Sequence, residues 1–164
     1  MSERERLSRR SILAAGAGLA AGAMSLPLGA GPHAPTPANP EGPFYPNRPQ
    51  ADTDADLTLI EGHEQRASGE VIRISGRVLD EDGQPVAGAV VDVWQANTHG
   101  RYHHENDPAT APVDPDFQGW AVMKTDAEGR YAFTTIKPGA SRVPGHWSRP
   151  PLIPFRVSLR GFHE

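Results

Sequence analysis

Two stretches of the chain alternate apolar with polar residues, and a short turn interrupts each of them. In the first stretch Ile72, Ile74 and Val78 alternate, the turn lies at residues 80–85 (DEDGQP), and the alternation resumes over residues 86–94. A period of two places successive side chains on opposite faces of a β-strand. The pattern therefore predicts two strands joined by a tight turn, which is a β-hairpin.

A second unit repeats this pattern further along the chain. Residues 121–124 are followed by a turn at residues 126–129 (DAEG), by a strand with Tyr131 and Phe133, and by a stop at residues 137–139 (KPG). This order predicts a second hairpin. Its aromatic side chains are expected to pack in the core.

A last alternating segment, residues 155–159, predicts one further strand. The chain has 17 Gly and 17 Pro in 164 residues, a composition that favours many turns and short strands over long helices. No segment is both long enough and periodic enough to predict a helix. We therefore expect an all-β fold, an antiparallel β-sandwich, with Trp94 in its core. Residues 103–118 predict a long irregular loop, and loops of this length are usually functional or disordered.

Composition excludes several functions. The chain contains no cysteine, so any metal ion must be held by oxygen and imidazole ligands. The chain has 16 basic and 20 acidic residues, of which four basic and two acidic residues lie within residues 1–30. The rest of the chain therefore has a net charge of −6. A domain of this sign repels phosphate backbones, and the sequence has no basic stripe with interleaved aromatic residues, so we expect no nucleic-acid partner.

The first 30 residues have the features of an export signal. Paired Arg9 and Arg10 precede an Ala/Gly/Leu-rich run, which predicts a twin-arginine signal that is cleaved after transport of the folded protein. The run is too weakly apolar to favour a permanent membrane anchor. Residues 31–40 are rich in Pro and Ala and predict a flexible linker. Residues 41–164 then form one domain, which we expect in the periplasm or outside the cell.

The two units belong to an ordered series of motifs that covers nearly all of residues 41–164. These motifs are EGPFYP at residues 41–46, DLTLI at 56–60, ISGRV at 74–78, VDVWQAN at 91–97, GRY at 100–102, TDAEGRY at 125–131, IKPG at 136–139 and RP at 149–150. Single hairpin motifs occur in many extracellular sandwich domains, but the whole series strongly resembles the intradiol ring-cleavage dioxygenases.

This resemblance implies a β-sandwich enzyme that holds Fe(III) with two tyrosinates and two histidines. Such an enzyme opens a catechol ring between its hydroxyl groups with O₂. Hard anionic phenolates stabilise ferric iron, and an arginine near the metal stabilises the negative charge that develops during the reaction. The resemblance also implies a homo-oligomer.

The family's site residues are only partly present in this chain. Tyr102 matches the first tyrosine ligand, and Arg149 matches the catalytic arginine. Ser141 stands where the family has its second tyrosine. Leu152 and Pro154 stand where it has its two histidines. The chain also stops before strands that the family adds at its C-terminal end, so we expect an incomplete sandwich.

A single tyrosine does not provide a tight site for ferric iron, because the phenol must lose its proton and needs further ligands to do so. We therefore expect Fe(III) to be weakly held or absent, and catechol cleavage to be impaired. Substitute histidine ligands are an alternative, and the available ones are His99, His103, His104, His146 and His163. Two further hypotheses are an exported binding module for an aromatic ligand or a protein partner, and a truncated product without a selected role.

Overall fold

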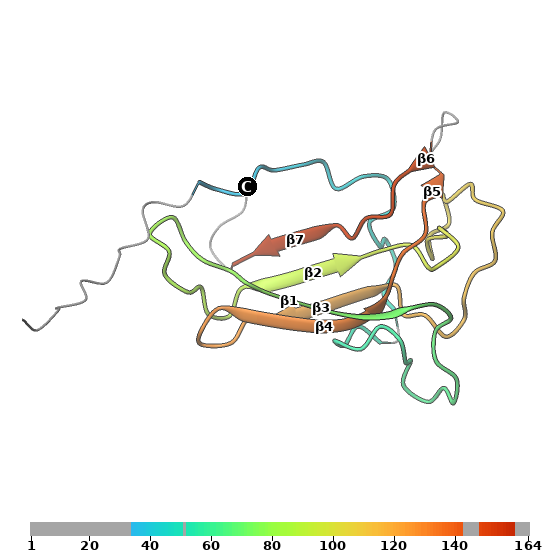
Figure 1. Cartoon of the computed structure of the whole chain (residues 1–164), viewed down its shortest axis with the longest axis horizontal. Coiled ribbons are helices and arrows are strands. Elements are labelled where there is room, and N and C mark those ends of the chain that lie inside the picture. The colour runs from blue at the N-terminus through green and yellow to red at the C-terminus, as the bar shows by residue number, and fades with distance from the viewer. Residues whose placement is uncertain (1–33, 51, 143–147, 160–164) are drawn as a thin grey trace, which may run out of the picture.

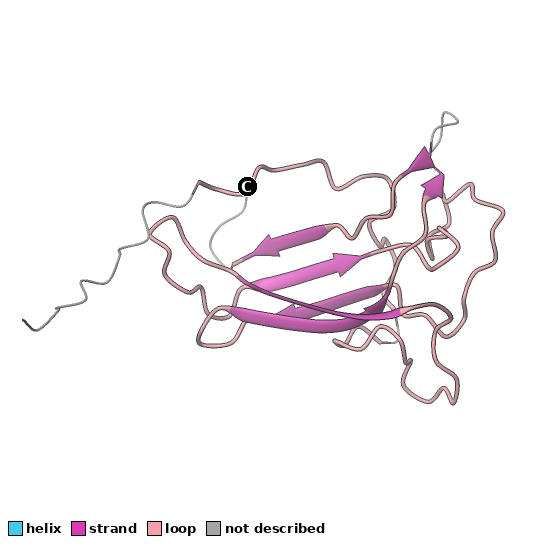
Figure 2. Ribbon diagram, viewed as in Figure 1, coloured by secondary structure: helices cyan, strands magenta, loops and turns pink. Residues whose placement is uncertain are grey.

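The computed structural model describes residues 34–50, 52–142 and 148–159. The predicted export segment, the start of the linker, His146 and His163 lie outside these ranges. The described residues contain strands and loops but no helix (Figures 1 and 2), and therefore no helix that could cross a lipid bilayer. The strands are β1 (Val71–Arg77), β2 (Val90–Trp94), β3 (Trp120–Lys124), β4 (Arg130–Ile136), β5 (Ser141–Arg142), β6 (Ser148–Arg149) and β7 (Phe155–Ser158).

The strands form two main antiparallel sheets and one small ladder. β1 pairs with β4 along its whole length, beginning with Val71 opposite Ile136. β2 is the central strand of the other sheet, which has the order β3-β2-β7. β5 and β6 form the small ladder, in which Ser141 lies opposite Arg149.

The inner faces of the two main sheets pack against each other. Val91 and Val93 of β2 are fully buried, and they share one apolar cluster with Phe133 and Ile136 of β4. Ile74 of β1 packs against this cluster from the same sheet as β4. The expected all-β antiparallel sandwich is confirmed, and so is the predicted core position of Phe133.

The opposite face of β2 is also covered, by the segment before the first strand. Side chains alternate along a strand, so Asp92 and Trp94 point away from the inner core. Trp94 is 2% exposed and belongs to a second cluster with Phe44 and Tyr102. Tyr45 packs its ring edge-on against Trp94, with 5.0 Å between ring centroids. The segment around residues 41–46 therefore packs over the outer face of β2. Trp94 is buried, as expected, but in this second cluster and not between the two sheets.

The pairing of the strands contradicts the two predicted hairpins. β1 and β2 lie in different sheets, and so do β3 and β4; each strand pairs with a strand from the other unit. The first turn is closed locally, by a bridge between Leu79 and Pro85 and by a hydrogen bond from the N–H of Val86 to the carbonyl oxygen of Val78 at 3.0 Å. The prediction of hairpins is wrong because alternation specifies which face of a strand is buried but not which neighbour it pairs with.

The turns act instead as arches between the sheets. In the second turn the Asp126 carboxylate accepts hydrogen bonds from the N–H groups of Glu128 and Arg130, at 2.9 and 2.8 Å. Gly129 has a φ of +72°, and a Cβ at this position would lie 2.5 Å from the carbonyl oxygen of Val78. The second arch is thus packed against the end of β1, which holds the two units together.

Candidate functional site

The loop that follows β2 begins with a turn built on Asn97. The side-chain oxygen of Asn97 accepts hydrogen bonds from the N–H groups of His99 and Arg101, at 2.9 and 3.1 Å. Its main-chain oxygen accepts from Gly100 and Gly139, at 3.0 and 2.9 Å. The bond to Gly139 ties this turn to the segment that leads into β5.

Gly100 allows the two segments to approach closely. Its φ is +77°, and a Cβ there would lie only 1.9 Å from the carbonyl oxygen of Ala140. No side chain fits at this contact, so glycine is required for both conformation and space. The contact brings Tyr102, two residues after Gly100, beside Ser141, the residue after Ala140.

Tyr102 is held in place through both its backbone and its ring. Its N–H donates to the Asp107 carboxylate at 2.6 Å, and the other oxygen of Asp107 accepts from the N–H of Ala109 at 2.8 Å. Its ring packs on Phe44, with 4.8 Å between centroids. Only 5% of Tyr102 is exposed. The residue is therefore a fixed, buried part of the fold and not a mobile loop side chain.

The structure brings together three positions that the sequence linked to the active site. Tyr102 lies beside Ser141, and the positive charge of Arg149 also acts on it. Burial raises the pKa of the Tyr102 hydroxyl, and this effect outweighs the hydrogen bond from Ser141 and the charge of Arg149, which lower the pKa. Tyr102 is thus a neutral phenol at neutral pH.

Comparison with known proteins identifies the family. Residues 40–153 match a family profile described as "Dioxygenase". The protocatechuate 3,4-dioxygenase beta chain of Burkholderia cepacia is 47% identical over 118 residues, which are 70% of this chain and 50% of that relative. The chain belongs to the intradiol dioxygenase family.

Other relatives and solved structures agree with this family. Catechol 1,2-dioxygenase 2 of Acinetobacter lwoffii is 34% identical over 82% of this chain and 50% of its own length. The solved catechol 1,2-dioxygenase from Pseudomonas arvilla C-1 is 30% identical, covers 77% of this chain and 42% of its own, and has a TM-score of 0.57. A solved 3-chlorocatechol 1,2-dioxygenase from Rhodococcus opacus 1CP shares the fold, with a TM-score of 0.60. It is 24% identical, and the match covers 78% of this chain and 53% of the solved chain. This chain spans about half the length of the curated relatives that it matches.

The side chains at the intradiol ligand positions do not fit ferric iron. Beside the neutral phenol of Tyr102 lie the Ser141 hydroxyl and the cationic Arg149. Leu152 and Pro154 have aliphatic side chains, and the main-chain oxygen of Pro154 accepts a hydrogen bond from Trp94. This donor set has no imidazole and no second phenol, and of the two charges that act on the Tyr102 hydroxyl the cationic Arg149 has the larger effect, ahead of the Asp107 carboxylate. The ligand role of Tyr102 and the catalytic role of Arg149 stay predictions.

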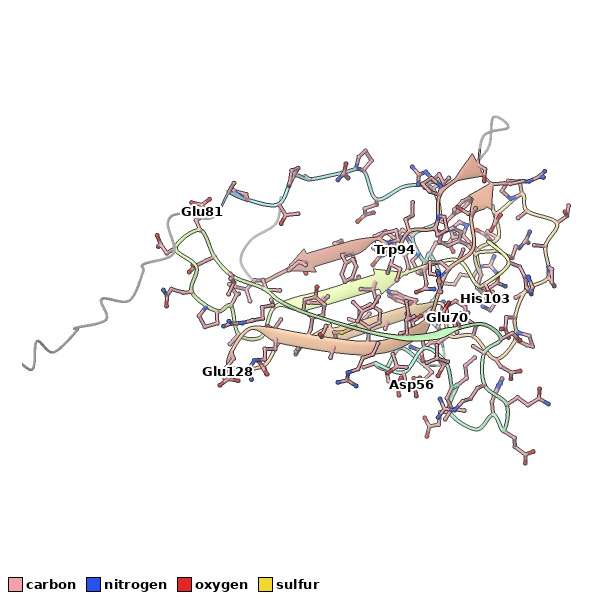
Figure 3. The ribbon with its side chains drawn as sticks, viewed as in Figure 1. Asp56, Glu70, Glu81, Trp94, His103 and Glu128 are labelled. Carbon is pink, nitrogen blue, oxygen red and sulfur yellow. The ribbon has the colours of Figure 1, made fainter. Side chains whose placement is uncertain are left out.

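The histidines near Tyr102 do not complete the intradiol site. Tyr102, His103 and His104 lie in a loop and not in a strand. The ring of His104 lies 5.8 Å from that of Phe44, and His103 is exposed (Figure 3). Among the residues that the structure describes, no three His, Cys, Asp or Glu side chains gather as a metal cluster would require.

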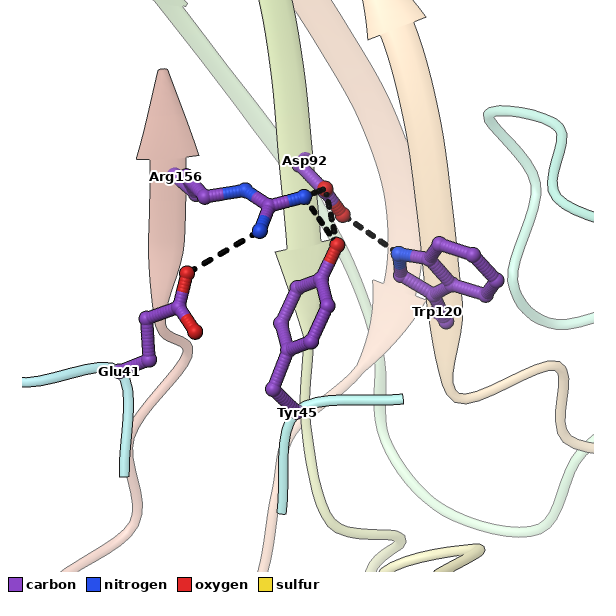
Figure 4. A network of polar contacts seen from close by, with 5 residues as sticks. All are labelled: Glu41, Tyr45, Asp92, Trp120 and Arg156. Atoms are coloured by element: carbon purple, nitrogen blue, oxygen red, sulfur yellow. Dashed lines mark hydrogen bonds and ion pairs between the residues drawn. The ribbon is translucent and has the colours of Figure 1, made fainter. Parts of the chain in front are cut away.

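A second polar cluster, which the sequence did not predict, lies on the outer face of β2 (Figure 4). Asp92 is 4% exposed, and Arg156 donates to its carboxylate at 2.7 Å. Tyr45 donates to the same oxygen at 2.8 Å, and the Trp120 indole donates to the other. Arg156 also pairs with Glu41 at 3.1 Å and donates to the Tyr45 hydroxyl. The signal that could have revealed the cluster is one charged residue within the apolar strand VVDVW.

A cavity of about 570 Å³ lies beside Tyr102, between the segment after Tyr45 and the long loop. Tyr102, Phe117 and Ile60 line it together with polar residues. A space of this volume accommodates a small organic molecule.

Proposed function

We propose that this chain is an intradiol dioxygenase family member in which catechol ring cleavage is impaired or lost. One observation carries the proposal: among the side chains that act on the Tyr102 hydroxyl are Ser141, Arg149 and Asp107, and none of them is an imidazole or a second phenol. The family resemblance implies a tyrosinate at position 141 and histidines at positions 152 and 154. The chain has the scaffold of the family without most of its donor atoms.

Electrostatics explains why the remaining tyrosine is insufficient. A phenol must lose its proton to bind ferric iron, and burial makes this loss harder at Tyr102 because its pKa is raised. The guanidinium of Arg149 favours the phenolate but repels a trivalent cation placed beside it. The site therefore lacks the anionic ligands that would offset the cost of deprotonating Tyr102 and the repulsion between Arg149 and the metal ion.

The test is reconstitution of the purified full chain with ferric iron. We expect no stoichiometric iron, no visible absorption from a tyrosinate-to-iron charge transfer, and no O₂ uptake with catechol or protocatechuate. A coloured protein that contains one iron per chain and consumes oxygen would refute the proposal. Metal content should also be measured on protein isolated without chelators.

A matched pair of variants tests whether iron binding fails because donor atoms are missing or because the fold is damaged. The triple variant Ser141→Tyr, Leu152→His and Pro154→His is expected to gain iron and the visible absorption. The control replaces Ser141 with Phe in the same double-histidine background, so it has similar bulk but no second phenolate. We expect the control to bind iron at least tenfold more weakly. Equal iron binding by both variants would show that the second phenolate is not the missing element.

A second candidate function is an exported module that binds an aromatic ligand or a protein partner. The cavity beside Tyr102 favours it, because Phe117 and Tyr102 give it aromatic walls. Calorimetry should then show catechol binding without turnover. Absence of any binding of catechol at millimolar concentration would count against an aromatic ligand.

We also propose that the protein is exported by the twin-arginine route and self-associates, with residues 1–30 as signal and residues 41–164 as the domain. The supporting observation is the arginine pair before the Ala/Gly/Leu-rich run. Replacement of Arg9 and Arg10 by lysine should leave the protein in the cytoplasm. Sedimentation of the mature chain tests whether it forms a homo-oligomer.

A further inference from the structure

We propose that the free edge of β1 binds an extended segment of a partner protein in which acidic residues alternate with apolar ones, added antiparallel to β1 as a further strand. The proposal does not depend on the proposed loss of ring cleavage, because Tyr102, Ser141 and Arg149 lie outside β1. It is carried by an open side of the sandwich, by the backbone of β1, and by the side chains on the two faces beside that edge.

One side of the sandwich is closed by the chain itself, and the opposite side is open. On the closed side the N–H of Val122 in β3 donates to the carbonyl oxygen of Thr53 at 2.9 Å. The N–H of Leu57 donates to the carbonyl oxygen of Thr134 in β4, also at 2.9 Å. Residues 53–57 therefore cover the outer edges of β3 and β4. The remaining edges of the two sheets are β1 and β7, which have no further neighbouring strand among the described residues (Figure 1).

The backbone of β1 has a row of polar groups that point away from β4. In an antiparallel pair, residues that exchange hydrogen bonds with the partner strand alternate with residues whose N–H and C=O groups point outward. The N–H of Val78 donates to Gly129 and the N–H of Lys137 donates to Glu70, each at 2.8 Å, so the even-numbered residues of β1 face β4. The odd-numbered residues of β1 therefore present their N–H and C=O groups at the free edge. Such an edge can pair with another extended chain.

The outer face of β1 and β4 carries three exposed arginines. Arg73 and Arg77 lie on β1, and Arg130 of β4 lies directly opposite Arg77. Among the described residues Arg73 and Arg77 form no ion pair, and the Nε of Arg77 donates to the main-chain oxygen of Glu128 at 3.0 Å. Arg130 has an exposed pair with the Glu128 carboxylate at 3.8 Å. Like charges directly opposite each other destabilise a sheet, so acidic side chains on an added strand would be favourable here.

The inner face beside the open side is apolar. Phe155 of β7 packs on Tyr131 and Phe133 of β4, with 6.0 and 5.9 Å between ring centroids. Side chains alternate along a strand, so Val157 lies on the same face of β7 as Phe155. The two residues nevertheless stay 40% and 50% exposed. Apolar side chains on the inner face of an added strand would cover part of this surface, so alternation of acidic and apolar residues matches both faces.

The closed side shows that this chain already uses such a segment. Within residues 52–57 an aspartate occupies every second position, Asp56 bridges to Thr134 of β4, and Leu57 is fully buried in the inner core. A second copy of β1 is a poorer occupant of the free edge, because an antiparallel pair of these strands would place Arg73 and Arg77 of both copies on one face. The charges therefore favour an acidic partner.

The test is fluorescence anisotropy of a labelled peptide titrated with the full chain. The probe is a fluorescein-labelled octapeptide that alternates Glu with Val and is blocked at both ends, and the comparison peptide has Lys in place of Glu. We expect the Glu peptide to bind in the micromolar to millimolar range and the Lys peptide at least tenfold more weakly. Failure of the Glu peptide to bind, or equal affinity for the two peptides, would overturn the proposal.

Methylation of the peptide backbone separates strand addition from simple attraction of charges. In an antiparallel pair the Glu residues lie opposite Arg73 and Arg77, so their N–H groups face β1, whereas the N–H groups of the Val residues point away. N-methylation of the Glu residues should weaken binding at least tenfold more than N-methylation of the Val residues. Equal weakening by the two modifications would show that no strand is added.

Variants of the protein test the same contacts. Ser75→Pro removes an N–H that points away from β4, so it should block the added strand and keep the ladder, with binding at least tenfold weaker. The double variant Arg73→Gln and Arg77→Gln should have an effect of similar size. Its control, Lys124→Gln with Arg142→Gln, removes two exposed positive charges from β3 and β5 and should change binding less than twofold.

Circular dichroism establishes that each variant is folded, and the methylated peptides test the backbone contacts on the wild type if Ser75→Pro is not. Equal affinity in the wild type and the double arginine variant would overturn the site. None of these results bears on iron binding at Tyr102, which the reconstitution experiment tests separately.

Discussion

Asp92 is a charged side chain at the centre of a buried strand. It is 4% exposed, and its two oxygens accept from Arg156, Tyr45 and Trp120. A buried carboxylate without partners would be strongly unfavourable, whereas one with several donors is tolerated. These contacts also join the segment before the first strand to β7, far apart in the sequence.

Replacement of Arg156 by Gln is therefore expected to destabilise the fold. The change leaves Asp92 buried with a charge that has lost its cation, and the free energy of unfolding should fall by about 2 kcal/mol, given that Arg156 is partly exposed. Urea denaturation measures the effect. The control is Arg48→Gln, which breaks an exposed pair with Glu105 and should change stability by about 0.5 kcal/mol or less. Similar losses in both variants would contradict a special role for Asp92.

At the scale of residues, the sequence predicted the neighbourhood of Tyr102 better than that of Asp92. The family resemblance placed Tyr102, Ser141 and Arg149 in one site, and the structure brings all three together. The sequence pattern gave no partner for Asp92, because its ion pair with Arg156 spans 64 residues and follows from strand pairing that alternation does not specify.

At the scale of elements, the alternation located strands and left their partners open. The predicted strands at residues 121–124 and 155–159 correspond to β3 and β7, yet both predicted hairpins are wrong. The turns contain the Asp and Gly residues of tight turns, and such residues serve an arch between two sheets as well as a hairpin within one. The distinction depends on packing between the sheets, which local sequence does not encode.

The contact between the loop after β2 and the segment before β5 depends on Gly100, and Gly100→Ala tests it. The added methyl would meet the Ala140 oxygen at 1.9 Å, so we expect a loss of about 3 kcal/mol or more and weaker packing around Tyr102. Gly62→Ala is the matched control, because Gly62 has a similar φ of +85° with nothing within 4 Å of the added atom. The control should lose only about 1 kcal/mol, which is the cost of holding an alanine at a positive φ. Thermal unfolding of both proteins gives the comparison, and equal losses would show that the close approach is not rigid.

At the scale of the whole molecule, composition and alternation were sufficient to predict an antiparallel sandwich. They did not predict that residues 41–46 cover the outer face of the second sheet, where Phe44 and Tyr45 pack on Tyr102 and Trp94. This segment has no alternating pattern of its own, and its position follows from side chains that it contributes to a cluster formed by distant strands. Stability is therefore shared between the two sheets and their N-terminal cover.

The pH dependence of unfolding tests this shared stability, because all three tyrosines of the chain have raised pKa values. Burial is the largest cause in each, and at Tyr45 the hydrogen bond to Asp92 and its negative charge raise the pKa further, to about 12. Between pH about 10 and about 12 the unfolded chain loses tyrosine protons that the folded chain keeps, so stability falls as pH rises through this window. These groups contribute no pH dependence well below pH 10.

We expect urea midpoints to fall steeply across this alkaline window in the wild type and less steeply in Tyr45→Phe. The variant lacks the hydroxyl that ionises, so its starting stability is lower but its slope against pH is reduced. The pKa of Arg156, the charged partner of Tyr45, is raised, so its guanidinium stays charged across this window, and the difference in slope therefore reports the ionisation of Tyr45. Identical slopes would mean that Tyr45 ionises at its ordinary pKa in the folded protein. In that case residues 41–46 would have to leave the sheet surface before the sandwich unfolds.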